Sequence, residues 1–242
     1  AYLLAFKRED LEQMANAPVV PIINKTQFSN FEICLPSLEV QKKIVELLDK
    51  AQSLIDKRLS QMEELSRLTQ SVFFNTFGDP NNNPKQFKKA PLKDYITKKP
   101  INGFFAKNDF YKQNGNAKVV WISDFVNKSE VNINNLKTVE TTENQIKKYQ
   151  INYGDILFVR SSLNVDGIGK AAYVPAHNQD NVIFECHIIK INLSKEIIPE
   201  FFQVLTETAY FRNQLMKNSK TATMTTISQA GIENCEIIIP EY

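Results

Sequence analysis

The sequence is poor in glycine, cysteine and histidine, and each shortage disfavours a class of site. Seven glycines among 242 residues make a dinucleotide-binding fold improbable, because its phosphate loop is glycine-rich. Cys34, Cys186 and Cys235 are odd in number and widely spaced, which argues against a disulfide framework and a zinc site. His177 and His187 stand at no recognisable ligand spacing from a cysteine or aspartate, so we expect structural roles for both. We therefore predict no catalytic residue and no metal site.

Long apolar runs are also missing. No stretch approaches the roughly 18 residues that a membrane-spanning helix needs, and the apolar start is cut short at Lys7-Arg8. Hydrophobic residues make up 43% of the chain and charged residues 23%, which is typical of a soluble globular protein. The unpaired cysteines suit a reducing compartment, so we expect a cytoplasmic protein.

The stretch from Ser37 to Phe77 contains neither glycine nor proline and is rich in good helix formers. It follows Pro36 and stops at Gly78, as a helix with a proline entry and a glycine cap does. At about 1.5 Å per residue it predicts a helical rod roughly 60 Å long. Its apolar face is wider than a coiled-coil seam, so we expect it to bind a partner helix through Val45, Leu48, Ile55, Leu59, Met62, Leu65 and Val72.

After a polar linker at residues 78–84, short apolar runs separated by turn residues predict strands. These runs are Val119 to Ile122, Asp155 to Val159, Ala171 to Val174, Val182 to Phe184 and His187 to Ile191. A helix is expected over Pro199 to Met216, followed by a final apolar run at Ile237 to Ile239. After a first helix over residues 1–16, the short apolar runs Ile22-Ile23 and Ile33-Cys34-Leu35 suit strands or extended connectors. The expected fold class is α+β: a β-rich domain with peripheral helices, built on a curved sheet and joined to one long coiled-coil-like helix.

The two ends of the chain resemble each other at a spacing of 204 residues. The matching pairs are Arg8 and Arg212, Leu11 and Leu215, Ile23 and Ile227, Asn30 and Asn234, Glu32 and Glu236, Ile33 and Ile237, and Pro36 and Pro240. The alternative is chance similarity between two amphipathic pieces. We favour a tandem in which domain and rod alternate.

Charge is unevenly distributed although the net charge is only +2. Between Lys85 and Lys118 nine lysines face two aspartates, a local charge of +7. Such asymmetry points to a polyanionic partner, and a solvated lysine-rich loop is the alternative. Gly167-Ile168-Gly169-Lys170 imitates part of a phosphate loop but lacks its other residues. We conclude that the chain is a binding protein.

The run Leu35 to Val45 resembles the Pro-Leu-Pro-Pro-Leu-x-x-Gln-x-x-Ile signature that opens a conserved helix in the specificity subunits of type I restriction–modification enzymes. Phe73 to Pro80 is similar to the Phe-Gly-Asp-Pro close of that helix. Gly154 to Ser162, followed by Gly169-Lys170-Ala171, resembles a segment of its target recognition domains. Ser37 and Ser162 depart from the usual Pro and Gly.

The resemblance implies a domain plan: the tail of a first target recognition domain at 1–36, a spacer helix at 37–77, a linker at 78–84 and a second such domain at 85–242. It implies double-stranded DNA, modification (methyltransferase) subunits and a restriction subunit as partners. It also implies no catalytic centre and no cofactor in this chain, because S-adenosylmethionine, ATP and Mg belong to the partner subunits. A homodimer through the long helix is a further expectation.

Candidate DNA contacts follow from this resemblance and from side-chain chemistry. Arg160 is the best candidate for a base-edge contact, because bidentate Arg–guanine pairing is the commonest specific contact. The candidates for phosphate contacts are Lys107, Lys112, Lys170 and Lys217, and Asn108, Ser161, Ser162 and Thr223 suit bases or phosphates. Two alternatives remain: a coiled-coil adaptor whose sheet domain binds a protein or peptide, and a stand-alone nuclease or methyltransferase.

Overall fold

The computed structural model describes residues 7–15, 22–32, 35–107, 110–111, 114–162, 167–221 and 225–240. The chain divides into two compact units, Ala1–Gln61 and Met62–Tyr242. The division falls inside one helix, α4 (Leu38–Phe77), which contributes residues to both units.

The N-terminal unit contains α2 (Arg8–Met14), α3 (Lys25–Ser29) and the first part of α4. Helix α3 begins with a reciprocal capping box: Gln27 N–H donates to Asn24 Oδ1 at 2.8 Å, and Asn24 N–H donates to Gln27 Oε1 at 3.0 Å. Helix α3 lies between the two short runs for which strands or extended connectors were expected, and no helix was predicted there. Ile22-Ile23 belongs to neither a helix nor a strand, and residues 33–34 lie outside the described residues. The Asn-x-x-Gln spacing was the overlooked signal.

Helix α4 is continuous over 40 residues, as the absence of glycine and proline predicts. At its start, Gln41 N–H donates to Ser37 O at 2.9 Å and the Gln41 side chain donates to Pro36 O at 2.7 Å. It stops at Gly78, whose φ of +79° suits a residue without Cβ and whose N–H donates to Phe74 O at 2.8 Å. Phe73 is its one buried residue.

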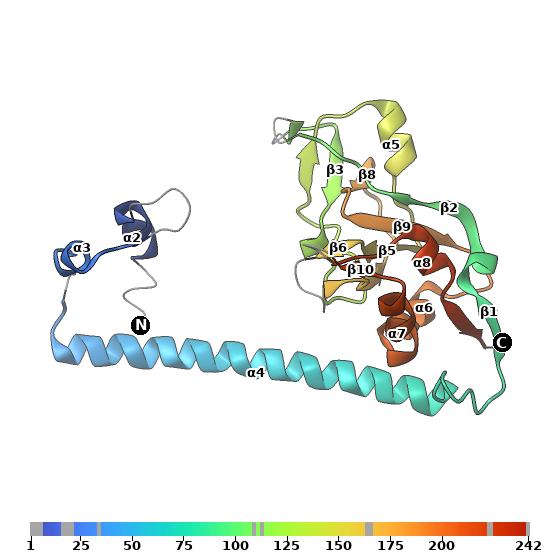
Figure 1. The fold of residues 1–242 in the computed structure, drawn as a ribbon, viewed down its shortest axis with the longest axis horizontal. Coiled ribbons are helices and arrows are strands. Elements are labelled where there is room, and N and C mark those ends of the chain that lie inside the picture. Colours follow the sequence, from blue (N-terminus) through green and yellow to red (C-terminus); the bar gives the residue numbers. More distant parts are fainter. Residues whose placement is uncertain are drawn as a thin grey trace. The chain divides into compact units, whose positions relative to one another are not determined.

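Among its described residues, the β-rich domain has four small sheets rather than the one curved sheet expected. Figure 1 shows how their strands are arranged. The central sheet has the antiparallel order β2 (Ile96–Asn102), β9 (Ile188–Leu193), β5 (Asp155–Val159) and β7 (Ala171–Tyr173). A second has the order β4 (Lys137–Val139), β3 (Ala117–Val120) and β8 (Val182–Phe184), with β3 and β8 parallel. The smaller sheets are β10 (Lys220–Thr221), β11 (Thr225–Thr226) and β6 (Ser161–Ser162), and the pair β1 (Lys88–Pro91) and β12 (Glu236–Ile239).

Helices flank the sheets, which confirms the α+β class. They are α5 (Glu143–Tyr149), α6 (Pro199–Glu207), α7 (Ala209–Lys217), α8 (Gln229–Glu233) and the 3-10 turns η1 (Leu92–Tyr95) and η3 (Ile122–Asp124). Strand β5 is buried on both faces: Ile156 and Phe158 join one hydrophobic cluster, and Leu157 and Val159 join another. This double burial explains why its sequence is continuously apolar rather than alternating.

The single helix expected over Pro199 to Met216 is two helices, α6 and α7, separated at Thr208. Thr208 takes an extended conformation with ψ of 150°. Its hydroxyl donates to Leu205 O at 2.7 Å and accepts from Phe211 N–H at 3.4 Å. One threonine thus caps both helices, which the apolar spacing could not reveal.

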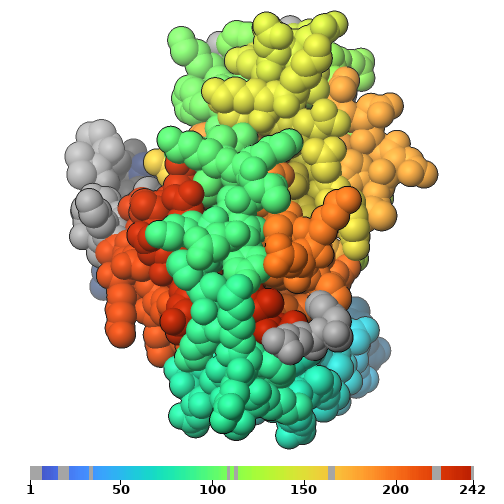
Figure 2. Space-filling view, turned by 90° about the vertical axis from the view of Figure 1, so that its right-hand side faces the viewer, coloured from blue at the N-terminus to red at the C-terminus, as the bar shows by residue number. Residues whose placement is uncertain are grey.

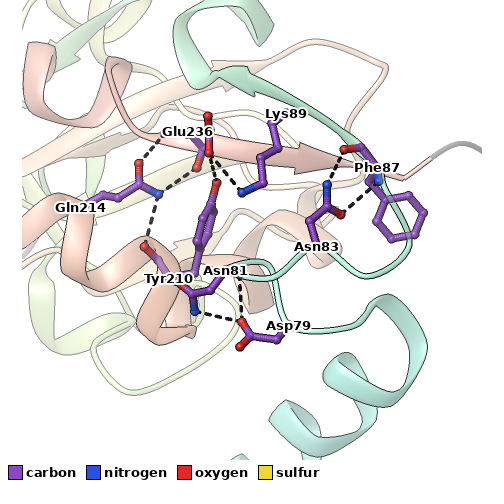
Figure 3. Close-up of polar contacts among 8 residues, drawn as sticks. All are labelled: Asp79, Asn81, Asn83, Phe87, Lys89, Tyr210, Gln214 and Glu236. Atoms are coloured by element: carbon purple, nitrogen blue, oxygen red, sulfur yellow. Dashed lines mark hydrogen bonds and ion pairs between the residues drawn. The ribbon is translucent and has the colours of Figure 1, made fainter.

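The linker after α4 is held by its own side chains (Figure 3). Asp79 Oδ1 accepts from Asn81 N–H at 2.9 Å, and Asn83 exchanges two hydrogen bonds with the Phe87 backbone at 2.7 and 3.0 Å. The linker leads into β1, which pairs antiparallel with β12. Beside this pair the Glu236 carboxylate accepts from Tyr210 OH at 2.7 Å and lies 3.4 Å from Lys89 Nζ.

The internal similarity at 204 residues extends to the helices. Helices α3 and α8 are displaced by 204 residues at both ends, since Lys25–Ser29 corresponds to Gln229–Glu233. Both start at a polar side-chain cap, Asn24 and Ser228. Their surroundings differ, because Phe28 is 52% exposed in α3 while Ile232 of α8 is fully buried. In the described part of the chain no helix is both long and apolar enough to cross a membrane.

Candidate functional site

Arg160 lies in the short break between β5 and β6, where both its backbone N–H and its carbonyl form hydrogen bonds. Its N–H donates to His187 O at 2.8 Å, and its carbonyl accepts from Ile227 N–H at 3.0 Å. Its side-chain Nη1 donates to Cys186 O at 3.3 Å, and the residue is half-buried. The guanidinium is therefore held at a defined place at the end of a buried strand.

Ser161 and Ser162 form β6 and pair with β11, Thr226 opposite Ser161 and Thr225 opposite Ser162. Ser161 is 8% exposed, and its Oγ lies 2.6 Å from Nδ1 of His187. Thr223 lies outside the described residues, in the connection between β10 and β11. The structure thus brings Arg160, Ser161 and Ser162 together with the strand that follows position 223.

The turn between β8 and β9 consists of Glu185, Cys186 and His187. The Glu185 carboxylate accepts from His187 N–H at 2.8 Å, and Ile188 N–H donates to Glu185 O at 3.1 Å. Burial raises the pKa of the Glu185 carboxyl, which is 3% exposed, while the His187 N–H and the Arg160 charge oppose that rise. We call this turn together with Arg160, Ser161 and Ser162 the Arg160 edge.

His187 was expected to lie within a strand, but it lies exposed in the turn before β9. Its predicted structural role is not tested by this position. The turn was missed because no glycine, proline or asparagine stands between Phe184 and Ile188. The turn is closed instead by the Glu185 side chain.

The loop after β2 reaches the same turn. Gly103 N–H donates to Ile188 O at 3.0 Å and Phe104 N–H donates to Phe184 O at 2.7 Å. A Cβ on Gly103 would stand 2.1 Å from Glu185 O, so only glycine allows this approach. The loop continues into Phe105, 72% exposed, and the exposed Lys107. Lys107 therefore follows a segment anchored directly to the Arg160 edge.

The other predicted lysines are spread over several elements. Lys170 is half-buried, and its carbonyl accepts from Val159 N–H at 2.9 Å, next to Arg160. Lys217 is exposed at the end of α7, shortly before β10. Asn108 and Lys112 lie outside the described residues.

The basic stretch predicted from the sequence is not one patch. Figure 2 shows the part from Lys85 to Asn102 running along one face of the domain. Its exposed lysines there are Lys85, Lys88, Lys93, Lys98 and Lys99. Lys107 instead lies in the loop anchored to the Arg160 edge, and Lys118 lies in β3, bonded to Gln179 at 2.9 Å.

Glu185, Cys186 and His187 are the group among the described residues that could hold a metal ion, with ligand atoms within 4.8 Å of one another. The contacts disfavour a cation. The carboxylate already accepts from a backbone N–H, and the Arg160 guanidinium bonds the same turn. Burial also raises the pKa of the Cys186 thiol, which favours the neutral thiol over the thiolate that binds metals. The absence of a metal site stays a prediction.

His177, the other histidine, lines a hollow of about 610 Å³ together with Asn134, Asn152 and Gln179. Both of its ring nitrogens are buried and have no hydrogen-bond partner among the described residues. Its predicted structural role is not tested by these contacts.

The predicted partner-binding residues of α4 are largely uncovered. Leu48 is half-buried, and the others are exposed by 45–62%: Val45, Ile55, Leu59, Met62, Leu65 and Val72. An exposed apolar row of this extent is typical of surfaces that bind another protein, and the partner-binding role of these residues stays a prediction.

A β-rich domain with an arginine-bearing polar edge, joined to a long helix with an uncovered apolar face, defines a modular binding protein. The chain belongs to the family described as the type I restriction modification DNA specificity domain, whose profile matches residues 1–64 and 84–242. This family assignment agrees with the resemblance seen in the helix and loop motifs.

Two curated relatives carry the same designation. The chain is 23% identical over 242 residues to the type I restriction enzyme EcoKI specificity subunit of Escherichia coli K12, covering 95% of this chain and 50% of that protein. It is 23% identical over 249 residues to the StySPI specificity subunit of Salmonella potsdam, covering 98% of this chain and 53% of that protein. The chain thus spans about half the length of these relatives.

The fold is also found in a chain from a solved type I R-M system, a structure that addresses complex assembly and conformational transition. The TM-score is 0.53 at 14% identity, covering 99% of this chain and 57% of the other. At this identity the likeness concerns the fold alone.

Proposed function

We propose that this chain supplies DNA sequence recognition in a type I restriction–modification complex, reading one half of a bipartite site. Membership of the specificity-domain family over both parts of the chain is the observation that carries the proposal. The chain itself has no catalytic role in this scheme. Adenine methylation with S-adenosylmethionine belongs to the modification subunits, and DNA cleavage with ATP and Mg belongs to the restriction subunit.

The Arg160 edge suits contact with base pairs. The Arg160 backbone is fixed by His187 and Ile227, so little conformational freedom is lost when its side chain binds. A guanidinium can pair in bidentate fashion with O6 and N7 of guanine in the major groove. Ser161, Ser162, Asn108 and Thr223 are the proposed neighbours, and Lys107, Lys112, Lys170 and Lys217 the proposed phosphate contacts that set affinity without reading sequence.

Helix α4 is the proposed spacer and docking element. Half-sites that face the same side of the duplex are separated by whole turns of about 34–36 Å, a scale that suits a helix of this length. The proposed domain plan places a first-domain tail at 1–36, the spacer at 37–77, the linker at 78–84 and the second recognition domain at 85–242. We expect the complex in the cytoplasm, because its proposed partners, DNA and the methyltransferase subunits, are found there.

The exposed apolar row of α4 is the proposed surface for a second long helix, either in a homodimer or from modification subunits. Leu59→Glu should abolish such pairing, because a carboxylate would be buried without a partner. Ser60→Glu is the matched control, since it adds the same charge on a side of the helix turned by about 100°. Sedimentation equilibrium gives the oligomeric state, and equal behaviour of the two variants would exclude this surface.

The central test assembles the chain with its modification subunits and maps methylated adenines in host DNA. We expect methylation at one bipartite sequence, and its loss when the chain is omitted. Methylation at the same sites without the chain would refute the proposal. Affinity of the assembled complex for the site should also fall steeply with salt, through counterion release, whereas a peptide-binding adaptor would show no such slope with DNA.

A further inference from the structure

We propose that His187 is a second base-contacting residue, which reads the base pair next to the one contacted by Arg160. The inference rests on the proposed function and names a further determinant of its specificity. The ligand is the edge of a purine in duplex DNA, which offers hydrogen-bond acceptors at N7 and, in guanine, O6.

The His187 ring has a fixed position although it lies at the surface. Its Nδ1 is 2.6 Å from Ser161 Oγ. The backbone N–H of His187 donates to the Glu185 carboxylate at 2.8 Å, and the backbone carbonyl of His187 accepts from the backbone N–H of Arg160 at 2.8 Å. Ring, amide and carbonyl are thus each held, which is the preorganisation that a recognition residue needs.

The contacts assign different tasks to the two ring nitrogens. Nδ1 is used by Ser161, and among the described residues no hydrogen bond is formed by Nε2. When the Ser161 hydroxyl donates to Nδ1, the proton of the neutral ring is on Nε2. In that state the exposed ring presents one N–H donor to a ligand, which matches the acceptors of a purine edge.

The same turn also holds Arg160, which explains why the two residues would act together. Arg160 Nη1 bonds Cys186 O, and the Arg160 backbone bonds His187 O. Two hydrogen-bond donors of different shape, the His187 ring and the Arg160 guanidinium, are therefore held by one closed turn. A contact by one would place the other within the same groove.

The decisive experiment compares His187→Gln with His187→Asn in the chain assembled with its modification subunits. The amide of glutamine can replace Nε2, and the shorter asparagine can replace Nδ1. A base contact through Nε2 predicts that His187→Gln keeps methylation specificity and that His187→Asn loses about tenfold or more discrimination at one base pair. A purely structural tie to Ser161 predicts the opposite order.

Controls separate this inference from the proposed function. His177→Asn, at the other histidine, should leave the recognised sequence unchanged, and His187→Phe should lose discrimination as asparagine does. Unchanged specificity in His187→Asn, or its loss in glutamine and asparagine alike, would overturn the base contact while the wild-type complex still methylates a defined site. Absence of site-specific methylation by the wild-type complex would overturn the proposed function itself.

Discussion

The ring of Phe73 in α4 stacks on the ring of Phe201 in α6, with centroids 5.5 Å apart and 27° between the planes. Phe77 completes the group, 5.0 Å from Phe73 and 4.9 Å from Phe201. The last turns of the long helix are therefore part of the hydrophobic core of the β-rich domain. This packing anchors the C-terminal end of α4 to the β-rich domain.

Replacing Phe73 by alanine should reduce the free energy of unfolding of the C-terminal unit by about 3–5 kcal/mol, because a large ring would be removed from a filled core. Urea denaturation followed by circular dichroism measures the change. Phe74→Ala is the matched control at the next position, where the ring is 36% exposed, and it should cost much less. Equal losses in the two variants would contradict the packing described.

Gly103→Ala should destabilise the loop that approaches the Arg160 edge, since the new Cβ would stand 2.1 Å from Glu185 O and 2.4 Å from Phe184 O. Both atoms belong to the backbone, so the strand ends must separate. The expected loss is about 1–3 kcal/mol, measured by thermal or urea unfolding. Gly167→Ala is the control: its new Cβ meets only the Ser162 side chain, at 3.0 Å from Oγ, so the loss of stability should be smaller. Unchanged stability in Gly103→Ala would exclude the close approach.

Glu185 predicts a pH-dependent term in stability. Burial raises the pKa of its carboxyl above the ordinary 4.5, so the folded state favours the protonated form. This contribution is full below the unfolded pKa and is lost as the pH rises through the folded pKa. Glu185→Gln does not titrate and still offers an oxygen to His187 N–H.

The measurement for Glu185 is urea unfolding of both proteins at about pH 4 and about pH 7. The free energy of unfolding of the wild type, relative to that of Glu185→Gln, should be lower at about pH 7 than at about pH 4. A difference that is constant with pH would show that the carboxyl has an ordinary pKa.

Arg160→Ala should relax or abolish recognition of one half-site while leaving the fold intact. Loss of a bidentate base contact costs about 1–3 kcal/mol of discrimination, which appears as new methylated sequences in the assembled complex. Arg160→Lys keeps the charge without the planar fork and should lose specificity as well. An unchanged methylation pattern in Arg160→Ala would remove this residue from the proposed contacts.

Lys107→Gln should weaken binding to all DNA sequences alike and lower the slope of log affinity against log salt by about 1, as expected for one phosphate contact. Filter binding or fluorescence anisotropy of the assembled complex at several salt concentrations gives the slope. Lys147→Gln, on the exposed face of α5, is the control and should leave it unchanged. A slope identical in both variants would place Lys107 away from the phosphates.

The long helix was predictable because its evidence is local. An uninterrupted run of helix formers ends at Gly78, and the observed helix Leu38–Phe77 follows it closely. Strands β5 and β8 were also predicted, since their apolar runs stand between turn residues. The break at Thr208 was missed because a single side-chain cap leaves no trace in hydrophobic spacing. The start of α3 at Asn24 was missed because the Asn-x-x-Gln spacing of its capping box was overlooked.

The candidate site was predictable only in part. Arg160, Ser161 and Ser162 follow a recognisable strand and were found together. His187 was misassigned to a strand, because its turn is closed by the Glu185 carboxylate rather than by turn-forming residues. Its proximity to Ser161 is a tertiary contact across 26 positions, and local sequence patterns contain no signal for such a contact.

The pairing of β1 with β12 brings the first and the last described strands of the β-rich domain side by side, with Lys88 opposite Ile239. Neighbouring entry and exit points are what allow a domain to be inserted or exchanged as a unit. A domain with different loops could replace this one without altering the length of α4. Under the proposed function, recognition and spacing are then independent variables, so a new sequence preference could be installed while the distance between half-sites stays constant.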